Sequence, residues 1–209
     1  MRVPERLEPL VKPIESFFKW QRAAMLNFRR PVPVYPAAPP AGLKVHVGPA
    51  EINLQGWVNV DARAFPHVHV QTSSLALSEF TDGAVSRIYI CHVLEHFSFA
   101  DAEDLLATFY RKLAPGGVLL VSVPDFDAIV RIYTDARRNL DSIKYTLMGG
   151  QTYDENFHKS VYNHDSLKAL LEAHGYGGVA RWTTDEEFGG SINDWSSSDL
   201  SLNLKATRR

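Results

Sequence analysis

The residues of this 209-residue chain best suited to proton transfer are His92, Glu95 and His96, which occur as His-Val-Leu-Glu-His. A neutral histidine near pH 7 can accept the proton of a hydroxyl group, and a positioned carboxylate can act in the same way. Two further candidates, Asp125 and His158, follow later in the chain. If these residues meet in one site, that site suits acid–base chemistry.

The segments around the motif predict a strand, a helix and a second strand. Apolar runs at residues 87–91 and 118–123 bracket a segment of helical periodicity, for which Ser98 is the expected N-cap. This order predicts a βαβ crossover. Ligands of open α/β sheets bind outside the carboxyl ends of the strands, so we expect residues 91–96 and 124–127 at the functional edge.

The bulk composition favours one globular domain with a sizeable core, since 45% of the residues are hydrophobic. Twenty-two basic and 24 acidic residues give a net charge of −2, so no global field would attract nucleic acid. The single cysteine, Cys91, excludes an intramolecular disulfide and fits a reducing compartment. No apolar run reaches the roughly 18 residues of a membrane span, and we expect a cytoplasmic protein.

Residues 1–30 predict a basic amphipathic helical segment, and residues 31–42 a proline-rich connector. Apolar side chains recur at helical spacing between Leu7 and Phe28, with lysines and arginines around them. We favour packing of this helix on its own domain or on a second subunit. The alternative is peripheral contact with the inner face of a membrane. Deletion of residues 1–30 should lower stability or change the oligomeric state, whereas binding to anionic vesicles would indicate the membrane.

Residues 43–209 alternate between predicted strands and helices and form the expected main domain. The strands are expected at residues 43–47, 57–61, 67–71, 87–91, 118–123, 179–182 and 200–206. Helices are expected after Ser98, at about 125–138, and between Asn163 and Gly175. The region between residues 182 and 200 is expected to be a polar loop.

Five features follow one another in order along the chain: Gly48 after the first strand, Asp61 closing the second, the motif at 92–97, Leu-Ala-Pro-Gly-Gly at 113–117 and Val-Pro-Asp-Phe-Asp at 123–127. Together they resemble the class I S-adenosylmethionine-dependent methyltransferases over residues 43–206. Residues 59–69, 147–151 and 201–204 are similar to a bacterial subgroup of predicted methyltransferases linked to surface-polysaccharide biosynthesis. The resemblance implies a Rossmann-like, mostly parallel seven-stranded sheet with a late antiparallel strand and helices on both faces.

The resemblance implies that S-adenosylmethionine binds at the carboxyl ends of the early strands, with S-adenosylhomocysteine as the product. In such enzymes the first loop lets the backbone approach the cofactor, and the acidic residue takes the ribose hydroxyls. Gly48 and Asp61 match these two positions. The other cofactor-binding candidates are Ala50 in the first loop, Thr72 and Ser73 after the third strand, and His92.

Transfer of a methyl group to a hydroxyl requires in-line positioning and a base. A base must reach the functional edge of the sheet, and this requirement selects His92, Glu95, His96, Asp125 and His158, although Asp125 can instead act as a helix N-cap. His158 lies in the polar and aromatic segment 149–162, which could close over a sugar acceptor. A base on a closing segment approaches the acceptor from the side opposite the sulfur, so we narrowly favour His158.

Three alternatives compete with O-methylation of a sugar or glycan intermediate. A catalytically silent binding or scaffold protein in glycan assembly is favoured by Pro49-Ala50 in place of a Gly-x-Gly turn and by Thr72 where the family commonly has an acidic residue. A nucleotide-dependent oxidoreductase would need Gly-x-Gly-x-x-Gly, which does not follow the first strand. His-x-x-Glu-His is also the pattern of inverted zinc peptidases, but its place at a strand end predicts no metal.

Overall fold

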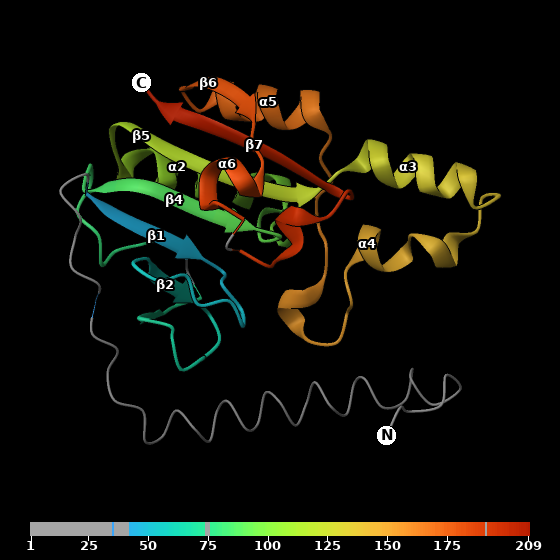
Figure 1. Cartoon of the computed structure of the whole chain (residues 1–209), viewed down its shortest axis with the longest axis horizontal. Coiled ribbons are helices and arrows are strands. Elements are labelled where there is room, and N and C mark those ends of the chain that lie inside the picture. Colours follow the sequence, from blue (N-terminus) through green and yellow to red (C-terminus); the bar gives the residue numbers. More distant parts are fainter. Residues whose placement is uncertain (1–34, 36–41, 74–75, 191) are drawn as a thin grey trace.

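Seven strands form one mixed sheet in the computed structural model, which describes Tyr35 and residues 42–73, 76–190 and 192–209. The strand order is β3-β2-β1-β4-β5-β7-β6; β7 pairs antiparallel with both β5 and β6, and the other strand pairs are parallel (Figure 1). The predicted mostly parallel sheet with a late antiparallel strand is therefore confirmed. The strands are β1 (Leu43–Val47), β2 (Val58–Asp61), β3 (Val70–Gln71), β4 (Val85–Cys91), β5 (Leu113–Pro124), β6 (Tyr176–Arg181) and β7 (Ser201–Arg208).

The centre of the sheet is buried on both faces, which explains why its strands read as continuous apolar runs. In β4 the side chains of Ile88 and Ile90 join the larger core cluster, whereas Tyr89 between them joins a second cluster with Trp57 and Trp182. Successive strand residues point to opposite faces. The apolar run in β4 therefore contributes to both layers of the core.

Helices cover both faces of the sheet. α2 (Phe99–Lys112) and α5 (His164–Ala173) contribute leucines to the larger cluster, and α6 (Thr184–Phe188) places Phe188 against the second. Ser98 caps α2, as the sequence predicts, by accepting a hydrogen bond from the Asp101 N–H. α3 (Phe126–Asp135) and α4 (Lys144–Met148) extend beyond the carboxyl ends of the parallel strands (Figure 1).

Two local predictions differ from the structure. The expected third strand at 67–71 is reduced to β3, which pairs with β2 through Val60 and Asp61 only. The expected polar loop after residue 182 contains α6, whose Glu187 makes ion pairs with Arg87 at 2.7 Å and with Lys205 at 2.8 Å. A helix of five residues is too short to show a periodic pattern in the sequence, and contacts with strands distant in the sequence stabilise it.

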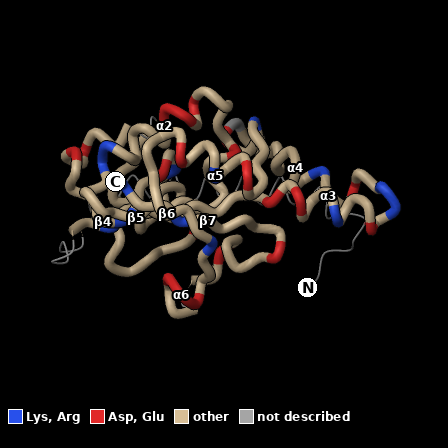
Figure 2. Tube along the Cα trace, turned by 90° about the horizontal axis from the view of Figure 1, so that it is seen from above, with Lys and Arg blue, Asp and Glu red and all other residues tan. Residues whose placement is uncertain are grey.

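Figure 2 shows the acidic residues of α6 close together along the trace, whereas acidic and basic residues are interspersed along much of the rest of the described chain. None of the described helices is long and apolar enough to cross a membrane. The predicted helical segment of residues 1–30 lies outside the described residues. Of the predicted connector, the structure describes only Tyr35 and Gly42.

Candidate functional site

A pocket of about 720 Å³ opens at the carboxyl ends of β1, β2 and β4. Its volume lies in the range of small-molecule sites, roughly 300–1,000 Å³. One wall comes from the loops after β1, β2 and β3, and the opposite wall from residues 145–159, which follow α3. The pocket therefore lies at the sheet edge on which the sequence places the candidate residues, and a later segment completes its lining.

The turn after β1 requires glycine at position 48. Gly48 has a φ of +69°, and a Cβ there would overlap Cγ2 of Val93, the residue that follows His92. Its N–H donates to the Val60 carbonyl at 2.8 Å, which ties the turn to β2. Because Gly48 carries no side chain, the backbone of this turn forms part of the pocket wall directly.

Asp61, the last residue of β2, is fixed by backbone groups from both sides. Its Oδ2 accepts a hydrogen bond from the Ala50 N–H at 3.0 Å, and its Oδ1 accepts one from the Arg63 N–H at 2.8 Å. A carboxylate oxygen can accept more than one hydrogen bond, so this arrangement orients the group and leaves acceptor capacity for a ligand diol. Gly48, Ala50 and Asp61 thus fit a cofactor with vicinal hydroxyl groups.

Arg63 connects this half of the pocket to the opposite wall. Its guanidinium lies over the ring of Tyr153, 5.1 Å from the centroid, and Nη1 donates to the Tyr153 hydroxyl at 3.2 Å. The contact joins the loop after β2 to the segment after α4. Sequence analysis missed both residues, because an arginine and a tyrosine on separate loops form no local pattern.

His92 directly follows β4 and has a left-handed backbone conformation, with a φ of +52°. Its Nε2 lies 2.8 Å from Oγ of Ser201, and that hydroxyl donates to the Trp195 carbonyl at 2.7 Å. The hydroxyl proton is therefore committed, so Nε2–H of His92 donates and the Nδ1 lone pair faces Oε1 of Glu95 at 3.3 Å. Burial, with nearby His158 and His96, lowers the pKa of His92 to about 3.

Glu95 lies beneath the pocket floor with 1% of its surface exposed. Within the described part of the chain, neither of its carboxyl oxygens has a hydrogen-bond partner, and the nearest ring nitrogen, Nδ1 of His92 at 3.3 Å, presents a lone pair to Oε1. Burial raises the pKa of Glu95 to about 8, against a smaller opposing effect of its own backbone N–H. A buried carboxyl group without partners is costly, which makes this residue the least satisfied polar group of the site.

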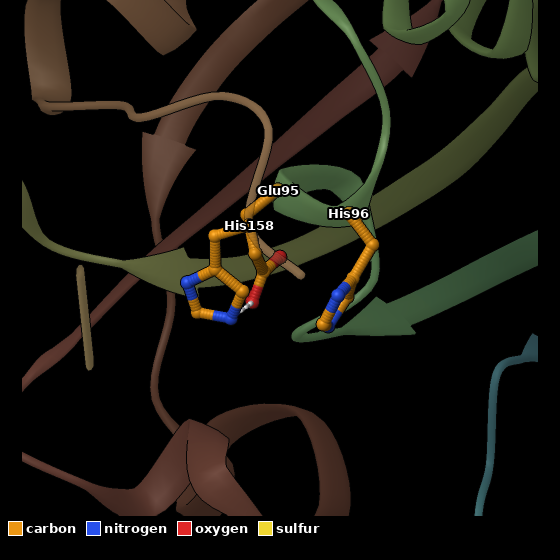
Figure 3. Close-up of side chains that lie close together, drawn as sticks. All are labelled: Glu95, His96 and His158. Carbon is orange, nitrogen blue, oxygen red and sulfur yellow. Dashed lines mark ion pairs between the residues drawn. The ribbon is translucent and has the colours of Figure 1, made fainter. Parts of the chain in front are cut away.

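His96 and His158 come together on either side of the Glu95 carboxyl group, although they are far apart in the sequence (Figure 3). Their ring centroids are 4.8 Å apart, and Nε2 of His158 lies 4.0 Å from Oε1 of Glu95. His158 is held there because the N–H groups of Lys159 and Ser160 both donate to the Glu95 carbonyl, at 2.7 and 3.2 Å. Burial lowers the pKa of His96 to about 4 and also lowers that of His158, so both rings are neutral near pH 7.

Most of the predicted site residues meet in this pocket. Asp125 does not: its Oδ1 accepts the Asp127 N–H at 3.0 Å and caps α3, which confirms the capping alternative. Glu95 lies under the floor. The predicted residues that line the pocket are Gly48, Ala50, Asp61, Thr72, Ser73, His92, His96 and His158.

Two solved structures show the same fold at low sequence identity. A SAM-dependent methyltransferase from Archaeoglobus fulgidus superposes with a TM-score of 0.53 at 14% identity, over 90% of this chain and 93% of its own. One from Thermotoga maritima superposes with a TM-score of 0.52, also at 14% identity, over 94% and 96% of the two chains. These likenesses concern the fold alone.

Comparison of sequences assigns the family. No curated protein matches the chain significantly. The model of the methyltransferase domain family, however, matches residues 39–180, which is well over half of the chain and includes β1 to β5, α2 and the pocket residues from Gly48 to His158. The chain therefore belongs to the methyltransferase domain family.

Proposed function

We propose that this protein uses S-adenosylmethionine to methylate a hydroxyl group of a small polar acceptor, a sugar or glycan intermediate. The observation that carries the proposal is that one pocket contains both halves of the required machinery. The Gly48 turn and Asp61 form one wall, and the neutral rings of His96 and His158 face it from the other side of the same cavity.

The residues of the first wall suit the cofactor. The bare backbone at Gly48 admits close approach, Ala50 holds Asp61 in place through its N–H, and the oriented carboxylate of Asp61 accepts hydrogen bonds from the ribose hydroxyls. Thr72 and Ser73 line the pocket where the adenine would lie, and His92 forms the wall beside it. The bound cofactor supplies an electrophilic methyl group, whose carbon–sulfur bond breaks as the acceptor oxygen attacks.

The opposite wall suits the acceptor and its proton. Tyr145, Tyr153 and Asn156 line this part of the pocket and offer the aromatic and amide groups that bind sugars. The hydroxyl proton passes to the neutral ring of His158, which lines the pocket beside His96. His158 has the favoured position, because its segment faces the cofactor wall across the pocket and permits in-line attack. The choice of a glycan acceptor is supported by the family resemblance.

A silent binding module is the second candidate function. Pro49 lacks an N–H group, so the first loop offers one donor fewer to a cofactor than a Gly-x-Gly turn would. This observation lowers the expected affinity without blocking the pocket, because the Gly48 turn and Asp61 still border the open cavity. Binding of the cofactor and transfer of its methyl group therefore separate the two candidates.

Calorimetric titration of the full chain with S-adenosylhomocysteine, followed by an assay with methyl-labelled S-adenosylmethionine, tests the proposal. We expect one site per chain with a Kd on the order of 1–100 µM, and alkali-stable label on a monosaccharide or nucleotide sugar, as an ether requires. Binding without transfer to any hydroxyl acceptor would favour the silent module. If neither ligand binds, the cofactor proposal is wrong.

A further inference from the structure

We propose that Glu95, His96 and His158 bind one divalent first-row transition-metal cation, such as Mn²⁺ or Zn²⁺, at the acceptor end of the pocket. One carboxyl oxygen and one ring nitrogen from each histidine lie within 4.8 Å of one another. Figure 3 shows the three side chains converging from two separate segments of the chain. Two imidazoles and a carboxylate are a ligand set that such cations prefer over Mg²⁺ or Ca²⁺.

The unpartnered carboxyl group of Glu95 is a second and independent observation. The side chain is 1% exposed, and within the described residues neither oxygen has a hydrogen bond, since Nδ1 of His92 faces Oε1 at 3.3 Å with its lone pair. Burial of a carboxyl group usually requires hydrogen bonds, a paired charge or a metal. The hydrogen bonds from Lys159 and Ser160 reach the backbone carbonyl of Glu95 and do not involve its side chain, so they do not explain why this position carries a carboxyl group. A bound cation would supply the missing partner.

The two histidines are oriented as metal ligands usually are. Nδ1 of His96 lies 3.2 Å from the Phe157 carbonyl, so it carries the proton and leaves the lone pair on Nε2. The ring of His158 interacts with backbone groups of Thr146 and Leu147, while its Nε2 is directed towards Glu95. Backbone contacts of this kind fix the ring orientation and the tautomer of ligating histidines.

This set of metal ligands differs from the set that the His-x-x-Glu-His pattern suggests. In the His-x-x-Glu-His pattern the two histidines of the motif would bind the metal, but the structure commits Nε2 of His92 to Ser201. His158 enters in its place, brought by the backbone hydrogen bonds from Lys159 and Ser160 to Glu95. Metal–ligand distances of about 2.0–2.2 Å require the three ligand atoms to close by roughly 1 Å or more, which side-chain rotation can provide.

A cation at this position would act on the acceptor. It lies on the pocket wall opposite Asp61, where a coordinated hydroxyl would have a lowered pKa and release its proton to water before attack. His158 would then contribute as a ligand instead of as a free base. This catalytic consequence rests on the proposed function, but binding of the cation does not.

The test uses full-length, tag-free protein from which metals have been removed by a chelator. Titration with MnCl₂ and ZnCl₂, followed by calorimetry and by the electron paramagnetic resonance of Mn²⁺, should show one site per chain. His158→Gln and Glu95→Gln should each weaken binding at least tenfold. His164→Gln is the matched control, because His164 lies beside Asp165 at the surface and should not affect this site.

Titration of the same preparations with S-adenosylhomocysteine reports whether each variant is folded and separates the two proposals. Unchanged cofactor binding with lost metal binding supports the cation site. The inference is overturned if the wild-type chain holds neither metal below a Kd of about 100 µM, or if both variants bind as the wild type does. A chain that binds the cation but not the cofactor would keep this inference and remove the proposed function.

Discussion

At the scale of single residues, the strongest assignment is Asp61. Its two carboxyl oxygens accept hydrogen bonds from Ala50 and Arg63, so the side chain organises two loops and presents the remaining lone pairs to the pocket. The sequence predicts its place at a strand end. The structure adds that the same residue has a structural role, since two backbone donors depend on it.

Asp61→Ala should therefore weaken both cofactor binding and the fold. Loss of hydrogen bonds to a charged acceptor should cost about 1.5–3 kcal/mol of binding free energy. The Kd for S-adenosylhomocysteine should therefore rise roughly 10- to 150-fold. Two unsatisfied N–H groups should lower the free energy of unfolding by about 1–3 kcal/mol. Calorimetry and urea unfolding measure the two effects. Asp104→Ala, at an exposed position of α2, is the control, and equal affinities in the two variants would show that Asp61 does not contact the ligand.

At the scale of elements, the end of β1 and the loop after β4 fit together around Gly48. The left-handed turn points the chain towards Asp61, and Val93 fills the space that a side chain would need. The two loops come from neighbouring strands, because β1 pairs with β4 in parallel. Both residues line the pocket, so this contact fixes the position of the Gly48 turn relative to the loop that carries His92 and His96.

Gly48→Ala should destabilise this junction through two separable causes. A left-handed backbone costs an alanine about 1–2 kcal/mol, and overlap with Val93 should add about 1–3 kcal/mol. Adding Val93→Ala should recover only the second part. A double-mutant cycle in urea measures this coupling. If the two substitutions are simply additive, the overlap with Val93 is not the source of the strain.

At the scale of the whole molecule, buried neutral histidines link folding to pH. His46 lies in β1 with 1% exposure and stacks on Tyr89 with ring centroids 4.8 Å apart. Burial lowers its pKa to about 3, assisted by His67 and opposed by Asp194 and a hydrogen bond with Asn59. Because the unfolded chain has the ordinary value near 6.5, it binds more protons than the folded chain between about pH 3 and 6.5.

The free energy of unfolding should consequently fall as the pH falls below about 6.5, by up to about 1.4 kcal/mol per pH unit for this one group. His46→Phe keeps a stacked ring and should make the decline less steep over that window. Urea unfolding at pH 7, 6, 5 and 4 measures the slope. The same substitution at half-exposed His164 should leave it unchanged, and identical slopes for His46→Phe and the wild type would contradict the assignment.

The sequence by itself determined which residues lie at the carboxyl ends of the early strands. Apolar runs mark the strands, and strand ends follow from where those runs stop, so Gly48, Asp61 and His92 could be placed at the carboxyl ends without coordinates. These are local patterns. The three residues meet at one edge because β1, β2 and β4 are parallel, so their carboxyl ends lie on the same side of the sheet.

Only the tertiary structure decided which side chains complete the site. His158 reaches Glu95 because the chain after α4 returns to the sheet edge and hydrogen bonds to the Glu95 carbonyl, whereas Asp125, close to the same edge, turns to cap α3. Nothing in the local pattern separates these two outcomes. Long-range contacts depend on how loops pack and satisfy their backbone groups, which is a property of the folded chain as a whole.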